Sequence, residues 1–261
     1  MPRAARYKPR VGPTLRCLAS PFLLAAQMRI LLINPNTSKQ VTEQLRSHIA
    51  QRDAEVAIDA ETAAFGETYI SSESAFAVAA HAVLDVWNRS LADAAPLPAA
   101  VLIGCFGDPG IFALREQSPV PVTGLAEASF RRAADHGPFA VVTGGAAWKP
   151  ILMRQALSTG FATQLSEIVT VEATGAELAA DPVSAHQLLR QACQKAAQSG
   201  AASIIVGGAG LAGIAARLQP YFDIPLIDSV TTGAEEAFAL ARKHAAVPAS
   251  KLTQSQLLPA A

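Results

Sequence analysis

VLIGCFGDPGIFALRE, at residues 101–116, reads as a buried strand, a tight turn and the first part of a helix. Its apolar start predicts the strand. The Gly-Asp-Pro-Gly sequence at 107–110 predicts the turn, and a helix is expected from Ile111. Cys105 stands where the strand ends. Because ligands of open α/β sheets bind outside the carboxyl ends of the strands, Cys105 is a candidate site residue, with a buried structural cysteine as the alternative.

The same pattern returns later in the chain as SIIVGGAGLAGIAARL, at residues 203–218. Both stretches have an apolar strand, a glycine turn and a helix that begins with Gly-Ile, and a proline follows in each. The matching positions include Gly110 and Gly213, Ile111 and Ile214, and Pro121 and Pro225. Gly208 takes the place of Cys105. The chain therefore reads as two related halves, with one thiol where the symmetry allows two.

Composition indicates a well-buried globular fold. Of the 261 residues, 51% are hydrophobic and only 16% are charged, and the formal net charge is zero. This balance predicts neither nucleic acid nor a membrane as a partner. The cysteines at 17, 105 and 193 show no disulfide or metal-ligand spacing, so we expect a cytoplasmic protein without a metal site. Cys193, on the apolar side of its expected helix, is interpreted as structural.

The first 27 residues differ from the rest of the chain. They carry five basic residues and no acidic one, and they end with a short apolar patch. The patch is too short to span a membrane, and a targeting segment is one interpretation. We favour a disordered extension, or a mis-assigned start with Met28 as the natural first residue. Residues 246–261 are expected to form a loose tail.

Strands and helices alternate between these ends, which predicts a parallel α/β fold. We expect two similar doubly wound halves, 28–135 and 136–245, related by pseudo-two-fold symmetry, with the active site in the cleft between them. Strands are expected at 28–33, 54–60, 101–104, 120–123, 139–143, 167–171, 202–206 and 225–227. Helices are expected at 39–51, 71–91, 111–116, 126–136, 151–158, 183–199 and 232–245. The loops 34–38, 105–110, 143–146 and 208–213 should line the cleft.

The first of these loops has the sequence NPNTS, at 34–38. Its Asn and Thr side chains, with the free N–H groups of a helix start, suit an anion or a carboxylate. They suit a simple turn and helix cap equally well. In the second half, Thr143 and Gly145 take the places of Asn34 and Asn36.

A glycine motif at 208–213 follows a strand, and Asp228 ends the next one, as in dinucleotide-binding folds. Two features oppose that interpretation. Pro220 shortens the intervening helix, and too little chain follows for the remaining strands of such a fold. Since the internal symmetry already accounts for the turn, we do not expect NAD.

Several motifs resemble the hydantoin racemases of the aspartate/glutamate racemase superfamily. They are NPNTS at 34–38, SAFAVAAHAVLD at 74–85, GCFGDPG at 104–110 and PVTGLAEA at 121–128. The similarity extends from Met28 to about Ala245. It implies a cofactor-independent racemase of amino-acid derivatives with a small-molecule substrate, and we expect a homo-oligomer.

The resemblance also implies a mechanism in which two thiols act on opposite faces of a stereogenic carbon. One takes the proton as a thiolate, and the other returns a proton. Cys105 falls on the first of these catalytic cysteines. Nearby N–H groups and polar side chains would stabilise the enolate. The expected substrate-binding residues are Asn34, Asn36, Thr37, Phe106, Thr143, Gly144 and Ala209.

The chain departs from the family pattern at Gly208, where GGAG at 207–210 replaces GCAG. Glycine has no group that can carry a proton, so the second catalytic thiol is missing. His81, where the pattern has proline, and the loop at 143–145 also depart. Malonate decarboxylases of the superfamily likewise work with a single thiol, although theirs lies in the other half.

Three functions therefore stay open. The favoured one is a racemase that acts on a small carbonyl compound such as a 5-substituted hydantoin, with Cys105 as base or acid and the second proton from water or another residue. The second is a single-thiol decarboxylase or isomerase, in which protonation on one face suffices. The third is a catalytically impaired relative that only binds its ligand.

Overall fold

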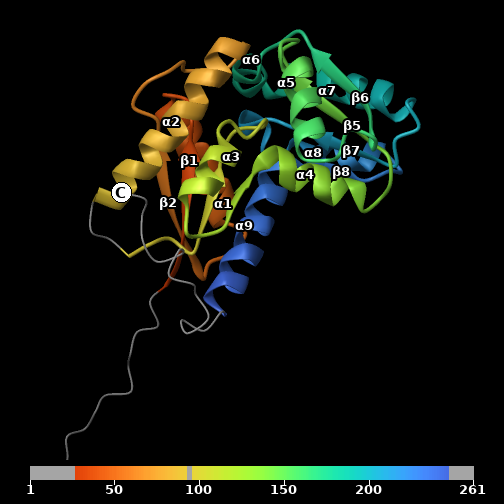
Figure 1. Cartoon of the computed structure of the whole chain (residues 1–261). Coiled ribbons are helices and arrows are strands. Elements are labelled where there is room, and N and C mark those ends of the chain that lie inside the picture. The colour runs from red at the N-terminus through yellow and green to blue at the C-terminus, as the bar shows by residue number, and fades with distance from the viewer. Residues whose placement is uncertain (1–26, 93–95, 247–261) are drawn as a thin grey trace, which may run out of the picture.

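Two four-stranded parallel sheets form the centre of the computed structural model, which describes residues 27–92 and 96–246 (Figure 1). The strand order is β2-β1-β3-β4 in one sheet and β6-β5-β7-β8 in the other. The repeated order confirms the predicted α/β architecture of two similar, doubly wound halves. The expected extension and tail lie, apart from Gln27 and Ala246, outside the described residues.

Each sheet has the nearly continuous apolar central strands of a sheet covered on both faces. The first contains β1 (Met28–Asn34), β2 (Val56–Thr62), β3 (Ala100–Ile103) and β4 (Val122–Gly124). The second contains β5 (Phe139–Gly144), β6 (Leu165–Val171), β7 (Ser203–Val206) and β8 (Leu226–Asp228). Leu32 of β1 pairs with Leu102 of β3, and Val142 of β5 pairs with Val206 of β7. The halves therefore present their strand ends in the same arrangement.

The helices of the first half are α1 (Lys39–Ala50), α2 (Glu73–Ala92), α3 (Ile111–Gln117) and α4 (Leu125–Ala134). Those of the second are α5 (Trp148–Ser158), α6 (Gly175–Ala180), α7 (Pro182–Ala197), α8 (Ile214–Leu218) and α9 (Ser229–Ala245), with short 3₁₀ turns η1 (Ala209–Leu211) and η2 (Gln219–Tyr221). Helix α6 was not predicted from the sequence. Helix α9 begins at Ser229 rather than 232, because the Asp228 carboxylate caps its first N–H groups.

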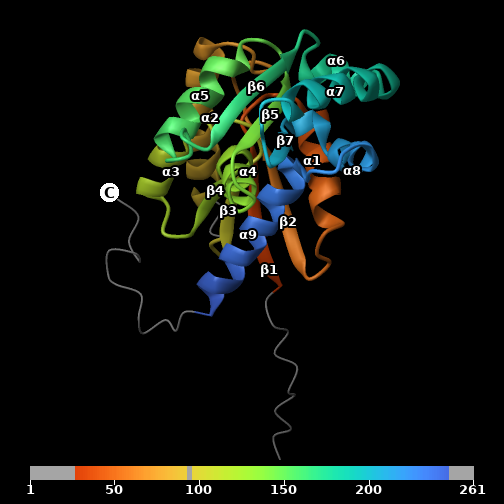
Figure 2. The same cartoon turned by 90° about the vertical axis from the view of Figure 1, so that its right-hand side faces the viewer.

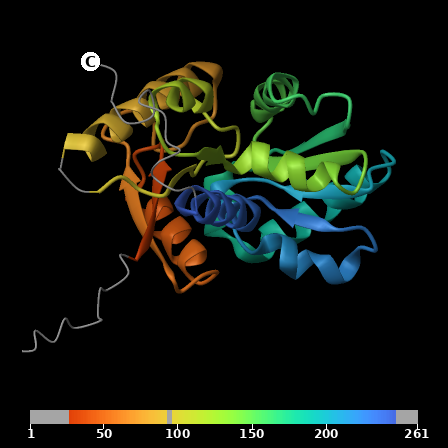
Figure 3. The same ribbon diagram turned by 60° about the horizontal axis from the view of Figure 1, so that its bottom comes forward.

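The last helix of each half packs against the other half. Helix α9 lies along β3, β1 and β4 of the first sheet, and α4 contacts β7, β8 and β5 of the second. Gly233 of α9 approaches Leu125 and Leu102, and the ring of Phe130 on α4 stacks on that of Phe139. Figures 2 and 3 show α9, in blue, leaving the second half to run beside the first sheet. Each half thus supplies one sheet, and its final helix packs against the sheet of the other half.

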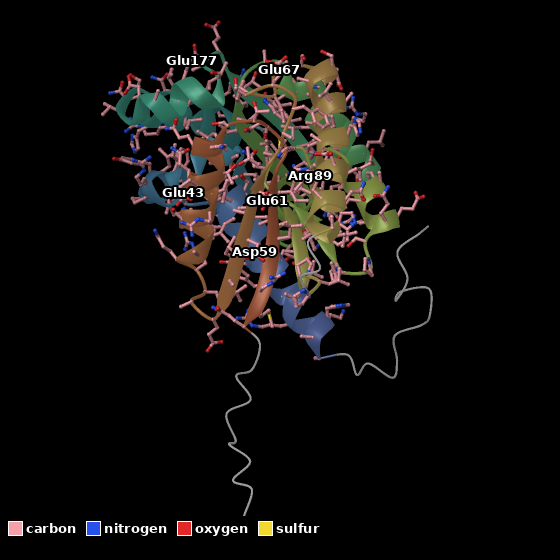
Figure 4. All side chains as sticks on the ribbon, turned by 90° about the vertical axis from the view of Figure 1, so that its left-hand side faces the viewer. Glu43, Asp59, Glu61, Glu67, Arg89 and Glu177 are labelled. Carbon is pink, nitrogen blue, oxygen red and sulfur yellow. The ribbon has the colours of Figure 1, made fainter. Side chains whose placement is uncertain are left out.

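The outer strand β2 carries charged residues along its open edge. Asp59 and Glu61 lie on this strand (Figure 4). Asp59 forms an ion pair with Arg29 of β1 at 3.3 Å. Charged side chains on an edge strand discourage its pairing with another strand. None of the helices in the described residues combines the length and the apolar character needed to cross a membrane.

Candidate active site

A cavity of about 320 Å³ lies where the carboxyl ends of the two sheets face each other. All four loops expected to line the cleft contribute residues to it. Its size suits a small molecule. Of the expected site residues, those that line the cavity are Asn36, Cys105, Phe106, Thr143, Gly144, Gly208 and Ala209.

Asn34 and Thr37, two expected substrate-binding residues, do not line the cavity. The fully buried Asn34 donates from Nδ2 to Oδ1 of Asn36 and to Oγ1 of Thr42, both at 2.9 Å. The backbone N–H of Thr37 donates to the carbonyl oxygen of Glu67 at 3.1 Å. Both residues therefore stabilise the conformation of the loop through contacts with the protein and not with the cavity.

Asn36 presents a free amide donor to the cavity. Its Oδ1 accepts from Asn34 and from the backbone N–H of Ser38 at 2.9 Å. Within the described part of the chain, its Nδ2 has no hydrogen-bond partner. Those two accepted bonds orient the amide, so Nδ2 is available to a ligand carbonyl.

Cys105 follows β3 at the wall of the cavity and is 6% exposed. Burial raises the pKa of its thiol above the ordinary range, and the negative charge of Asp108 adds to the rise. The neutral thiol is therefore the main form near neutral pH, with a small thiolate fraction. Such a group is a weaker acid than an ordinary thiol, and it accepts a proton only through the minor thiolate form, which is the more basic for the raised pKa.

Asp108 connects the turn after Cys105 to the start of α4. Its carboxylate accepts from the backbone N–H groups of Ala126 and Glu127 at 2.8 and 2.7 Å. Burial raises the pKa of Asp108 to about 7, opposed by these two N–H groups. A Cβ on Gly124 would overlap this carboxyl group, so the capping contact requires glycine there.

Gly208 has the backbone conformation of a glycine. Its φ of +145° lies in the region that L side chains rarely adopt. A Cβ added here would lie 3.2 Å from Cγ of Leu211. The backbone N–H of Gly208 donates to Oγ of Ser229 at 3.2 Å. The position that matches Cys105 thus differs from it in backbone geometry as well as in side chain.

Asp228, the acidic residue of the dinucleotide-like pattern, is used inside the fold. Its Oδ2 accepts from the backbone N–H of Gly213 at 2.6 Å, and its Oδ1 accepts from those of Val230 and Thr231. Its carboxylate therefore fixes the turn and caps α9. In the described residues, no group of three or more His, Cys, Asp or Glu side chains is placed to hold a metal ion.

Two aromatic residues that line the cavity, Tyr69 and Trp148, are not among the site residues expected from the sequence. The hydroxyl oxygen of Tyr69 accepts from the backbone N–H of Gly175 at 2.9 Å. Trp148 packs edge-on against Phe76 and lies close to Gly107. Tyr69 follows β2 at its carboxyl end, so the rule that singled out Cys105 would also have found this loop.

Comparison with known proteins agrees with this geometry. The family model described as Asp/Glu/Hydantoin racemase matches residues 30–237. A hydantoin racemase of Paenarthrobacter aurescens is 31% identical over 216 residues, covering 82% of this chain and 91% of the relative. A hydantoin racemase of Rhizobium meliloti is 29% identical over 216 residues, covering 82% and 88%.

Comparison with solved structures points to the same family. The solved allantoin racemase from Klebsiella pneumoniae has a TM-score of 0.77 and 27% sequence identity, and the match covers 83% of this chain and 88% of that one. The sequence match to the family spans most of the chain, including both sheets and the cavity loops. The chain therefore belongs to the Asp/Glu/Hydantoin racemase family, in its hydantoin racemase-like branch, and is an isomerase of the racemase type.

Proposed function

We propose that the protein racemises a small neutral cyclic amide, such as a 5-substituted hydantoin, with Cys105 transferring the proton. The observation that carries this proposal is a thiol on the wall of a cavity whose described lining is neutral. The names of the relatives, hydantoin racemase and allantoin racemase, point to the same substrate class.

The chemistry of the lining supports a neutral, amide-rich substrate. Its polar side chains include the amides of Asn36, Gln40 and Gln44. Amides pair with the N–H and C=O groups of a cyclic ureide, whereas a buried ionised group needs a charged partner. Trp148 and Leu211 supply apolar surface on which the substituent at the stereogenic carbon can pack.

The proposed reaction begins at the carbon next to the substrate carbonyl. The Cys105 thiolate takes the proton from this carbon, and the electron pair of the broken C–H bond moves into the carbonyl to give an enolate. A donor such as Nδ2 of Asn36 stabilises the oxygen that becomes negative. Reprotonation on the opposite face produces the other enantiomer.

Proton exchange in deuterated water tests this proposal. Each enantiomer of a 5-substituted hydantoin is incubated with the enzyme, and deuterium at the stereogenic carbon and optical rotation are followed together, against an enzyme-free control. We expect exchange with loss of chirality. Cys105→Ser should slow racemisation by about 10²- to 10⁴-fold, the usual contribution of a general acid–base group.

Cys193→Ser is the matched control. Cys193 is also buried, but it lies in the core of the second half away from the cavity. We expect this variant to racemise at the rate of the unsubstituted enzyme. The hydantoin assignment is wrong if the unsubstituted enzyme produces no exchange above the enzyme-free control. Release of carbon dioxide from an arylmalonate would instead indicate the single-thiol decarboxylase.

A further inference from the structure

We infer that the hydroxyl group of Tyr69 transfers the second proton, on the substrate face opposite Cys105, in the place of the thiol that Gly208 lacks. This inference rests on the proposed racemase function and adds to it a residue at a different position in the fold. It assigns a catalytic role to a loop that the internal symmetry of the chain does not single out.

The position of the hydroxyl group is the first argument. Tyr69 belongs to the loop between β2 and α2 of the first half, but its hydroxyl oxygen is hydrogen-bonded to the N–H of Gly175 in the second half. A Cβ on Gly145, also in the second half, would lie 3.6 Å from this oxygen. Figure 4 shows Glu67, of the same loop, and Glu177, of α6, at one end of the molecule. The phenol therefore lies on the second-half wall, whereas Cys105 lies on the first.

The chemistry of the cavity is the second argument. Among the described residues that line it, Cys105 and Tyr69 are the ones whose side chains act as general acids and bases. The remaining lining residues carry amides, alcohols, an indole, aliphatic or phenyl groups, or no side chain. His48, on α1, lies in a different hollow, where its Nε2 pairs with Oγ1 of Thr231 at 3.0 Å.

The direction of the Tyr69 hydrogen bond is the third argument. The backbone N–H of Gly175 donates, so the hydroxyl oxygen accepts and its own proton is not used in this bond. That proton is available to a substrate carbon. The same N–H then stabilises the negative charge that remains on the oxygen after donation.

The proton balance of the step is complete. The Cys105 thiolate forms an S–H bond as the substrate C–H bond breaks and the enolate forms. The enolate carbon then forms a C–H bond on the other face as the O–H bond of Tyr69 breaks. The enzyme is left with a thiol and a phenolate, and transfer of one proton through water restores it. In the reverse direction, the phenolate removes the proton and the thiol returns one.

Exchange of separate enantiomers in Tyr69→Phe tests the inference. We expect the enantiomer that Cys105 deprotonates to exchange its proton for deuterium and keep its configuration. We expect exchange of the other enantiomer, and racemisation, to fall by at least about 100-fold. Cys105→Ser should show the opposite preference, because it keeps Tyr69 and loses the thiol. This reciprocal selectivity would not arise from a merely structural role, which would slow both enantiomers together.

Tyr221→Phe is the matched control, since Tyr221 is exposed on the second half and packs against His186 and Arg190 outside the cavity. It should racemise normally. Racemisation by Tyr69→Phe at the unsubstituted rate, or an equal loss for both enantiomers in a variant of unchanged Tm, would overturn the inference. If the unsubstituted enzyme exchanges one enantiomer only, with retention, Cys105 keeps its role and Tyr69 has none. If it exchanges neither, the proposed function fails too.

If Tyr69→Phe does not fold, a second measurement that keeps Tyr69 tests the same inference. The sequence has three tyrosines, Tyr7, Tyr69 and Tyr221, so Tyr7→Phe with Tyr221→Phe leaves Tyr69 alone. Incorporation of 3-fluorotyrosine then makes this one phenol more acidic. We expect the pH profile to move to lower pH for the enantiomer that Tyr69 deprotonates and to stay unchanged for the other. An equal shift for both enantiomers, or no shift, would count against Tyr69.

Discussion

The aromatic ring of Phe106 lies against the backbone of Gly207, in the space that a Cβ at residue 207 would fill. Phe106 directly follows Cys105 in the chain, and Gly207 directly precedes Gly208. This contact joins the two halves beside both positions that the family symmetry relates. The cavity is therefore built by packing between the halves rather than within either one.

Gly207→Ala should destabilise the protein, because the added methyl group would overlap the Phe106 ring. Overpacking of this kind costs about 1–3 kcal/mol. Gly207→Ala in a Phe106→Ala background is the control, with its loss taken relative to Phe106→Ala alone, because the ring that the methyl group would overlap is then absent. Thermal unfolding should show the larger loss for Gly207→Ala in the unsubstituted protein, together with slower racemisation. Equal losses in the two backgrounds would contradict the packing argument.

Gly208→Cys restores the cysteine of the family pattern, but the backbone conformation at residue 208 does not suit a side chain. The φ of +145° and the nearby Leu211 side chain oppose any Cβ, so we expect a loss of about 1–3 kcal/mol in the free energy of unfolding. Gly208→Ala is the matched variant, with the same strain and no thiol. A faster racemisation by Gly208→Cys than by Gly208→Ala, measured by polarimetry, would show that the new thiol reaches the substrate. Equal rates would show that it does not.

The alternation of strands and helices and the internal repeat predict both sheets and the loops of the cavity, because apolar runs and glycine turns are local signals. The exchange of α4 and α9 between the halves is not local. The apolar face of a helix shows that the helix packs on a sheet, but it does not show on which of the two sheets. Only the tertiary contacts determine this. The repeat therefore predicts two similar halves but not which sheet each final helix covers.

The candidate site likewise combines features that local sequence signals predict with features that only tertiary contacts reveal. Asn34 and Asn36 are the same residue type two positions apart, and only the folded loop shows that one faces the protein and the other the cavity. Tyr69 lies in a stretch of sequence without a recognisable motif. Its hydroxyl oxygen is hydrogen-bonded to the backbone N–H of Gly175, 106 positions later in the chain. The place of Cys105 on the cavity wall could be predicted because it belongs to a strand–turn–helix pattern with a family signature.

Racemisation should accelerate as the pH rises from neutral into the alkaline range. Burial and Asp108 raise the pKa of Cys105, so the thiolate is the minor form below that pKa. Its fraction grows about tenfold for each pH unit in this range, and so should the exchange rate of the enantiomer that Cys105 deprotonates. Initial exchange rates across a pH series check this. A rate that falls over the same range would contradict the assignment of Cys105 as the base.

Asp108→Asn should lower the pKa of Cys105, because it removes the negative charge next to the thiol. At a fixed neutral pH, the exchange of that enantiomer should become faster per folded molecule. The amide keeps one oxygen to cap α4 and loses the second acceptor, so the Tm should fall. Titration with a thiol reagent of a protein in which Cys17 and Cys193 are both replaced by serine, so that Cys105 is the one thiol left, measures the pKa directly with and without Asp108→Asn. A pKa that is unchanged or higher would show that Asp108 acts on the helix alone.

Asn34→Ala and Asn36→Ala should separate the support of the loop from the binding of substrate. Asn34→Ala removes the buried amide that donates to Asn36 and Thr42 and should lower the Tm, because each lost hydrogen bond costs about 0.5–1.5 kcal/mol. Asn36→Ala removes the proposed donor to the substrate carbonyl and also the acceptor of two loop hydrogen bonds. It should therefore lower the Tm as well, but slow racemisation by about 10²-fold or more beyond the effect of Asn34→Ala, as loss of one oxyanion donor does. Paired measurements of Tm and of kcat/KM distinguish the two effects. If Asn36→Ala keeps full activity, the oxygen of the enolate is stabilised by the backbone instead.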